Sequence, residues 1–277
     1  METIRALYFT LPIFGITLSP LAFSVSCGDT IITPTILTED LVCTLDANNL
    51  NALTIVGPTG SLVMNGHSLM CILDNIPVFS DSAGVRIEGI SSLLSKGAIS
   101  NCNYGVFVVG IGLHTIDDMK IENNLEDGID LRSDQNFAIN NYISHNGEDG
   151  IDMQGDFNRV TNNYIEFSGR DGIEADNDFG TVTLNYVTGS GRAGIEMQAS
   201  SNNYISQNIV IGNGDGVSAD SGGIVITSLS SSNNVISGNV ANGNTPFDLV
   251  DRIDPDCTGS NIWTGNFFDT ADPSCLD

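Results

Sequence analysis

Acidic side chains recur at a fixed spacing through the middle of this chain. Four of them lie 22 residues apart, each directly after a Gly-Ile pair: Asp130, Asp152, Glu174 and Glu196. A second acid precedes the glycine in three of these phrases, at Asp127, Asp149 and Asp171. Paired carboxyl groups can act as a general acid and a general base, and larger groups can hold a hard cation such as Ca²⁺. Either chemistry requires a fold that brings these residues together.

The elements that would position the acids form an internal repeat. The phrases EDGIDL, EDGIDM, RDGIEA and RAGIEM start at residues 126, 148, 170 and 192, and a weaker GDGVSA starts at residue 214. A period of this length is typical of stacked supersecondary units. In each phrase apolar residues alternate with the acid, which indicates a short strand with one buried face.

Three apolar columns can be aligned on this repeat. They are Ile129, Ile151, Ile173 and Ile195; then Ile116, Ala138, Val160, Val182 and Tyr204; then Ile121, Ile143, Ile165, Val187 and Ile209. Three short strands in 22 residues leave no room for a helix. The sequence therefore predicts an all-β fold, a single-stranded parallel β-helix with about 4.8 Å between successive coils.

Two further columns support coil-on-coil stacking. Asparagines align at Asn141, Asn163 and Asn185, with Gln207 predicted to continue them, and tyrosines align at Tyr142, Tyr164 and Tyr186. We interpret the tyrosines as ordinary stacking on an outer sheet in preference to a sugar-binding platform.

The 277-residue chain divides into three predicted parts. Residues 1–26 contain an apolar run that Pro12 and Pro20 interrupt and that no basic flank follows, which indicates a secretory signal rather than a membrane span. Residues 27–250 form the predicted β-helix domain, and residues 251–277 form a C-terminal cap. We therefore expect a secreted monomer, periplasmic or at the cell surface in a bacterial source, with no stable membrane span after signal removal.

All six cysteines follow the predicted signal, which fits an oxidising compartment. Fifteen pairings are formally possible. Their distribution favours three local pairs: Cys27 with Cys43, Cys71 with Cys102, and Cys257 with Cys275. No C-x-x-C pair occurs, so a zinc site is not expected.

The net charge of −25 makes nucleic acid an unsuitable partner. The same charge would repel an acidic polysaccharide unless bound cations intervene. Solubility, or adaptation to salty surroundings, is the alternative explanation of this charge.

The chain resembles secreted right-handed parallel β-helix repeat proteins of the pectin-lyase-like superfamily. The resemblance is carried by CGDTI, LTEDLVC, ALTIV and LVMNGHSL near the start, by the GI-x and NN-x-I coils, and by Trp263-Thr264-Gly265-Asn266 in the tail. It implies a right-handed helix capped at both ends. The superfamily includes polysaccharide lyases, uronan C5-epimerases, inverting glycoside hydrolases and members with no known activity. The D-P-H, N-T-D, G-H-G and R-I-K motifs of its epimerases and polygalacturonases are missing from this sequence, so no catalytic residue can be transferred.

The candidate site therefore comes from the repeat itself. We predict catalytic roles for Asp152, Glu174, Asp176 and Arg170, substrate binding by Arg132, Gln154, Arg192, Glu196 and Gln198, and a Ca²⁺ set of Asp149, Asp152, Asp171 and Glu174. The coil from Arg170 to Asp176 combines an arginine with three acids, and we place the centre there. A strand advances about 3.3 Å per residue, so the β-carbons of Glu174 and Asp176 should lie about 6.6 Å apart, near the carboxyl separation of inverting glycosidases. Across neighbouring coils, Asp152 and Glu174 should lie closer to the retaining separation of about 5 Å.

These residues predict a secreted carbohydrate-active protein that binds and processes a polysaccharide by lyase, C5-epimerase or inverting hydrolase chemistry. The alternative is a non-catalytic extracellular protein, of the cell wall or of adhesion, that binds glycan or Ca²⁺. A third interpretation is that the acids form only a solvated face, duplicated along with the core.

Overall fold

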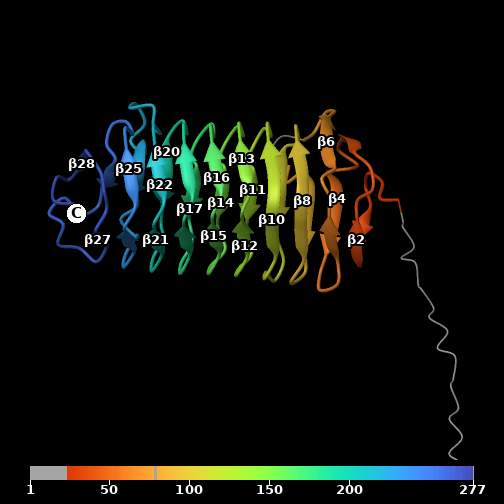
Figure 1. Ribbon diagram of the computed structural model, residues 1–277, viewed down its shortest axis with the longest axis horizontal. Helices are drawn as coiled ribbons and strands as arrows, with labels where there is room; N and C mark the ends of the chain where they lie inside the picture. The colour runs from red at the N-terminus through yellow and green to blue at the C-terminus, as the bar shows by residue number, and fades with distance from the viewer. Residues whose placement is uncertain (1–23, 78–79, 277) are drawn as a thin grey trace, which may run out of the picture.

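The computed structural model describes residues 24–77 and 80–276, and all of its regular elements there are β-strands. Most of the predicted signal, residues 1–23, lies outside this range. The strands wind into a straight solenoid of stacked coils, with the two ends of the described chain at opposite ends of the stack (Figure 1). Every strand pairing is parallel, as predicted for a right-handed β-helix. None of the described residues belongs to a helix long and apolar enough to cross a membrane.

Sheet A runs along one side of the solenoid and carries the acids. Its 11 strands follow one another in chain order. They are β1 (Thr30–Ile31), β4 (Asn51–Val56), β7 (Ala83–Glu88), β9 (Tyr104–Val108), β11 (Ile129–Leu131), β14 (Ile151–Met153), β17 (Ile173–Ala175), β20 (Ala193–Met197), β23 (Gly222–Ile226), β26 (Leu249–Asp251) and β28 (Ala271–Asp272).

The other strands form the remaining walls of the solenoid, which we call sheet B. They are β2 (Pro34–Ile36), β3 (Leu41–Leu45), β5 (Ser61–Val63), β6 (Ser68–Leu73), β8 (Leu93–Ser100), β10 (Thr115–Glu122), β12 (Phe137–Ile139), β13 (Tyr142–Ser144), β15 (Arg159–Thr161), β16 (Tyr164–Glu166), β18 (Thr181–Thr183), β19 (Tyr186–Thr188), β21 (Tyr204–Ser206), β22 (Ile209–Ile211), β24 (Val235–Ser237), β25 (Val240–Asn242) and β27 (Ile262–Thr264). A typical coil therefore contains three strands, for example β11, β12 and β13.

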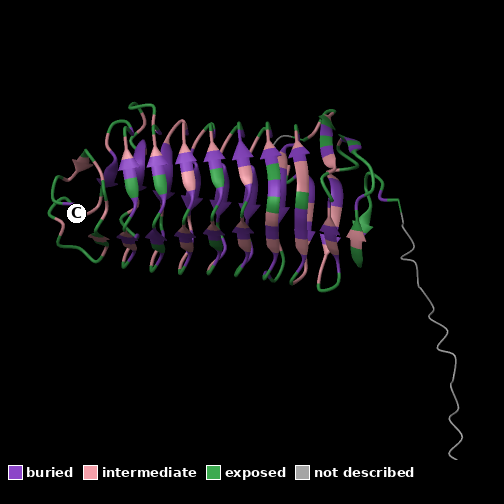
Figure 2. Cartoon of the chain, viewed as in Figure 1, coloured by how far each residue is buried: buried purple, intermediate pink, exposed green. Residues whose placement is uncertain are grey.

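The solenoid interior is a continuous apolar core built from the predicted columns. The four isoleucines that follow the repeated glycines are fully buried, and so are the first four members of each other column. Figure 2 shows this burial along each coil. The glycines themselves are needed for close packing, because a Cβ at Gly150 would lie 2.5 Å from the carbonyl oxygen of Gly172.

The fifth member of two columns was predicted one residue too early. The structure pairs Val182 with Ile205 and Val187 with Val210, in place of Tyr204 and Ile209. The reason is one extra residue between β20 and β21, where Ala199 is exposed and has a positive φ of 50°. The turn absorbs this residue, so the stacking of the coils continues.

The asparagine column is a buried hydrogen-bonded ladder. Asn141 N donates to Asn163 Oδ1 at 2.9 Å, and Asn163 N donates to Asn185 Oδ1 at 2.9 Å. The extra residue makes Asn208, not Gln207, the next member. Each amide also bonds a backbone carbonyl, as Asn163 Nδ2 does with Ala138 O at 2.9 Å.

Three disulfides close the predicted local loops. Cys27 bonds Cys43, Cys71 bonds Cys102 and Cys257 bonds Cys275. The first and third staple the terminal coils, which have a neighbour on one side only.

We expect Asn163→Ala to lower the free energy of unfolding by about 2 to 4 kcal/mol, because it leaves the buried Asn141 N–H and the Ala138 carbonyl without partners. Thermal unfolding followed by circular dichroism measures this loss. The matched control is Asn162→Gly, which removes an exposed amide from a position with φ 57° that glycine accepts. Equal melting temperatures for the two variants would contradict a stabilising ladder.

Candidate functional site

Sheet A places the four repeated acids in one file, which we call the carboxylate ladder: Asp130, Asp152, Glu174 and Glu196. The structure pairs Asp130 with Asp152, Asp152 with Glu174, and Glu174 with Glu196 on adjacent strands β11, β14, β17 and β20. Their side chains alternate with the core isoleucines and therefore point away from the interior. The predicted register of the acids is thus confirmed.

The carboxylate ladder is buried despite its outward direction. Asp130 and Glu196 are 0% exposed, and Asp152 and Glu174 are 7% exposed. The interpretation as a solvated acidic face is therefore wrong. Burial disfavours a carboxylate, and nearby acids add to this effect.

Three rungs of the carboxylate ladder have an arginine beside them. Arg132 Nε donates to Asp130 Oδ2 at 2.9 Å, and Arg192 lies 3.0 Å from Glu196 Oε2. The contact of Glu174 is longer, 3.8 Å from its Oε2 to the guanidinium of Arg170. These ion pairs compensate part of the buried negative charge.

Asp152 differs from the other rungs because no arginine or lysine of the described chain lies within 4.0 Å of it. Its Oδ2 accepts a hydrogen bond from the neutral Gln154 Nε2 at 2.6 Å, and its buried Oδ1 has no partner. Burial, followed by the charge of Asp130, raises the pKa of Asp152 to about 7. Burial also raises the pKa of Asp130, but Arg132 opposes this and the value is about 6. The Asp152 carboxyl group therefore gains or loses its proton near neutral pH.

The second row of acids, Asp127, Asp149 and Asp171, lies beside the ladder and is also buried. Asp127 Oδ1 accepts from Asp149 N at 2.8 Å, and Asp149 Oδ1 accepts from Asp171 N at 2.7 Å. Burial raises the pKa of Asp127 to about 8. It also raises the pKa values of Asp149 and Asp171, to which neighbouring acids contribute.

Two groups of three acids bring carboxylate oxygens within 4.8 Å of one another. One group is Asp127, Asp130 and Asp152, and the other is Asp149, Asp171 and Glu174. The second contains three members of the predicted Ca²⁺ set, whereas Asp152 belongs to the first. Buried oxygens of Asp130, Asp152 and Asp171 accept no hydrogen bond. Such oxygens suit a hard cation.

The ends of the carboxylate ladder are apolar, a feature the sequence reasoning missed. Phe107 pairs with Asp130 at one end, and the guanidinium groups of Arg86 and Arg132 lie over its ring at 5.1 and 4.5 Å. Val225 pairs with Glu196 at the other end. Extending the repeat backward from Asp130 by one coil would have reached Phe107.

Beyond Glu196, sheet A carries a small apolar cluster on its outer surface, formed by Ala193, Val225 and Val250 with Phe247 packed against them. The loop before β23 borders this end, where a carboxylate oxygen of Asp220 lies 2.9 Å from the guanidinium of Arg192.

The other predicted residues lie around the carboxylate ladder. Asp176 follows β17; its Oδ1 is buried without a partner, and burial raises its pKa to about 6. Gln198 follows β20 and is half-buried. Arg170 also contacts Glu148 at 3.3 Å and Asp149 at 3.8 Å, and these acids raise its pKa. An arginine held this way cannot readily act as a base.

The sequence matches one known protein family. A model of the right-handed beta helix region matches residues 41–154 and 104–269. No curated protein matches the sequence.

Several solved structures share the fold at low sequence identity. One is a mutant of the periplasmic alginate epimerase AlgG, with a TM-score of 0.62, 15% identity, and coverage of 86% of this chain and 60% of that one. The A-module of the mannuronan C-5 epimerase AlgE4 of Azotobacter vinelandii has a TM-score of 0.51 and 12% identity over 85% of this chain and 86% of that one. The Dettilon tailspike protein has a TM-score of 0.56 and 15% identity over 86% of this chain and 52% of that one. This chain thus spans about half the length of the tailspike.

The buried acids predict that stability without divalent cations falls as the pH rises from 5 to 8. The unfolded chain releases these protons near pH 4, whereas the folded chain holds them until the raised pKa values are reached, so stability is full below pH 4 and is lost toward pH 8. Thermal unfolding in a chelator at several pH values measures this. We expect Asp152→Asn to match the wild type near pH 4 and to melt at a higher temperature at pH 8.

The matched control for this measurement is the exposed Asp256→Asn, which should keep the wild-type pH dependence. If Asp152→Asn had the same slope against pH as that control, the raised pKa of Asp152 would be disproved.

Proposed function

The chain belongs to the right-handed β-helix family, and on this premise we propose that it binds a polysaccharide along the carboxylate ladder and acts on it by acid–base chemistry. The named activities of the fold relatives support this choice. One is a periplasmic alginate epimerase, one is a mannuronan C-5 epimerase, and another is described as the enzymatically active domain of a bacteriophage tailspike. The proposal is limited to polysaccharide processing, because lyase, C5-epimerase and inverting hydrolase chemistry all use such groups.

Asp152 carries the proposal. It is the one rung of the carboxylate ladder without a neighbouring arginine, and its pKa of about 7 lets it hold a proton at neutral pH and release it readily. A general acid or base works best when its pKa is near the working pH. Its Oδ1 is buried without a hydrogen-bond partner, which favours a proton on this group over a negative charge.

The neighbouring rung supplies the complementary group. Glu174 lies on the adjacent strand, and its Oε2 lies 3.8 Å from the guanidinium of Arg170. We assign Asp152 as the proton donor and Glu174 as the group that activates water or removes a proton, with Asp176 beside it on the same strand end. Arg170 is then a positioning residue for Glu174.

Substrate binding is assigned to the residues that flank these acids. Gln154 is exposed next to Asp152, and Gln198 lies two positions beyond Glu196. Arg132 and Arg192 pair with the two outer rungs and are themselves partly exposed, so their guanidinium groups can donate hydrogen bonds to a substrate at either end of the ladder, with Glu196 holding Arg192 in place.

We further propose that the protein works outside the cytosol. Three disulfides and the absence of free cysteines in the described residues support this, because such bonds persist in oxidising compartments.

Turnover provides the test of the enzymatic proposal. Polysaccharides, including uronans, are screened for new reducing ends, for the absorbance of unsaturated uronates and for epimerisation. Removal of a general acid typically costs 10²- to 10⁴-fold, so we expect Asp152→Asn to lose about 100-fold or more of kcat on the active substrate. Asp256→Asn should retain wild-type activity. Equal rates for the two variants, or no product from any polymer, would rule out the enzymatic proposal.

A second candidate function is binding of Ca²⁺ without catalysis. The two groups of three buried acids support it, because their oxygens lie close together and several lack hydrogen-bond partners. A bound Ca²⁺ would neutralise the buried charge and could bridge to a sugar carboxylate. The two functions differ in whether a proton or a cation occupies the carboxyl groups.

Cation binding is tested by thermal unfolding at pH 8 in chelator and in millimolar Ca²⁺ or Mg²⁺. A cation that binds only the folded state at 100 times its dissociation constant stabilises it by about 2.7 kcal/mol. We expect Ca²⁺ to raise the melting temperature of the wild type and Asp171→Asn to reduce the rise. An unchanged melting temperature in Ca²⁺ would exclude this function.

A further inference from the structure

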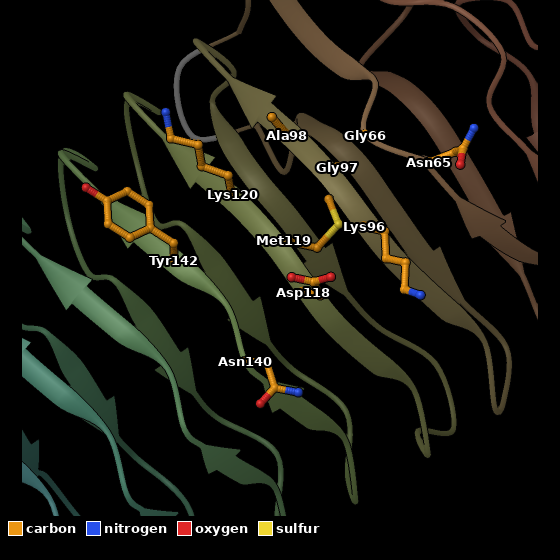
Figure 3. A pocket seen from close by; sticks show the side chains of 10 residues that line it. All are labelled: Asn65, Gly66, Lys96, Gly97, Ala98, Asp118, Met119, Lys120, Asn140 and Tyr142. Carbon is orange, nitrogen blue, oxygen red and sulfur yellow. The ribbon is translucent and has the colours of Figure 1, made fainter.

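The outer surface of sheet B changes character along the solenoid. Its N-terminal half carries charges, and Figure 3 shows Lys96, Asp118 and Lys120 on the strands β8 and β10, around an open pocket of about 760 Å³. Arg159 on β15 and Glu166 on β16 are the last charged residues of its strands in chain order. From β18 to β27, the sheet B strands that the structure describes contain no acidic or basic residue.

The loss of charge extends over long stretches of the sequence. Residues 179–191, 197–214, 221–247 and 257–268 contain no Asp, Glu, Lys or Arg, although the chain has 34 acidic and nine basic residues. These stretches supply the sheet B strands of four successive coils. Asp269 lies at the edge of this region, where its Oδ2 accepts a hydrogen bond from Asn242 Nδ2 at 2.7 Å.

Two files of apolar side chains point outward from these coils, and we call them together the uncharged face. One file is Tyr204, Val235 and Ile262, and the other is Tyr186, Ile209, Val240 and Phe267. Five of the seven are between 36% and 67% exposed. Ile209 and Val240 form the exposed starts of β22 and β25, which are green in Figure 2. The uncharged face is thus an apolar surface open to solvent.

The fold itself does not require apolar residues at these positions. In earlier coils the first file contains Arg159 and Thr181, and the second file contains Lys120. The stacked coils therefore accept charged and polar side chains in the same register. A sheet surface that faces water normally carries such residues. The apolar side chains of the later coils call for a partner that covers them.

The charge of the protein favours a second copy of this chain as that partner. Two copies with a net charge of −25 each repel one another over most of their surfaces. The uncharged face is where they can approach without placing like charges together. Few charged residues and several aromatic ones also distinguish the centre of a protein interface, and homodimer interfaces are the more apolar class. Tyr204 and Phe267 supply exposed aromatic rings here.

The size of the uncharged face sets the expected strength of association. Four coils at about 4.8 Å by eight residues at about 3.3 Å cover about 500 Å² on each copy. Two copies then bury about 1,000 Å² in total, which is at the lower limit for specific interfaces. We therefore expect a weak dimer whose population depends on protein concentration.

We propose that the uncharged face is a dimer interface, at which two copies associate around a two-fold axis. An axis between Ile209 and Val240, in the middle of the four coils, places Ile209 of one copy against Val240 of the other. It also brings Tyr186 of one copy to Phe267 of the other. Such a contact is the same on both copies, so it closes at two.

The dimer departs from the monomer expected from the sequence, because the two files form one surface only in the folded coils. It does not rest on the proposed function. The carboxylate ladder lies on sheet A, so an interface on sheet B leaves it uncovered in both copies.

Sedimentation velocity over a wide range of protein concentration, at low and at high NaCl, tests the interface. We expect the sedimentation coefficient to rise from that of a monomer to that of a dimer. Salt should strengthen the dimer, because it screens the repulsion between the two copies. Val240→Glu should weaken the dimer by about tenfold or more, since it places like charges together at the axis. Phe267→Ser, which adds no charge, should also weaken it.

The matched control is Val42→Glu, which makes the same change at a 56% exposed position on β3, at the other end of the solenoid. It should dimerise as the wild type does. The melting temperature of each variant, measured at a concentration where monomers predominate, shows whether it is folded. Asp152→Asn should keep the wild-type dimer, so a loss of turnover in that variant tests the proposed function alone.

Three results would overturn the interface. One is a wild-type monomer at every concentration and at both salt levels. Another is equal dimerisation of Val240→Glu and Val42→Glu when both are folded. The third is a monomer that floats with phosphatidylcholine vesicles through the uncharged face, which would assign this face to a membrane surface.

Discussion

The structure depends on one constraint, that every residue of a coil lies directly over its counterpart about 4.8 Å away in the next coil. Parallel pairing imposes this register along both sheets, as in Asp130 with Asp152 and Tyr142 with Tyr164. A side chain in such a fold must therefore be compatible with a copy of itself. Isoleucines satisfy this requirement by packing on one another. Asparagines satisfy it by donating and accepting hydrogen bonds, and tyrosines satisfy it by stacking their rings.

Carboxyl groups do not satisfy the requirement when they are charged. An amide offers both a donor and an acceptor, so Asn163 can bond to the coils on either side, whereas two carboxylates offer only acceptors. Sheet A resolves this with arginines at Asp130, Glu174 and Glu196 and with backbone N–H groups at Asp149 and Asp171. Asp152 receives only an amide. Asp152 is therefore the rung at which the constraint is least satisfied. An added proton, cation or substrate would stabilise this rung more than the others.

Much of this arrangement follows from the sequence. The repeat predicted the strands, most members of the apolar columns and the register of the acids, because each depends on spacing alone, and the distribution of the cysteines predicted the three disulfides. Burial of the acids did not follow, since alternation shows which way a side chain points but not what covers it. The same limit applies to the choice of a centre for the site. The coil with Arg170 was favoured for its many charges, whereas the structure draws attention to Asp152 because Glu148 and Gln154 stand where other coils have arginines. The single added residue near Ala199 shifted two columns, because a turn of variable length leaves no mark in an apolar pattern.

The apolar ends of the carboxylate ladder give it a defined length. It begins next to Phe107 and ends next to Val225, and three coil spacings between its first and last rungs amount to about 14 Å. Beyond Phe107 the same file continues with Arg86, and beyond Val225 it continues with Val250, so the stacked acids occupy only this interval. The register therefore limits how many units of a polymer on sheet A could lie beside a rung at one time.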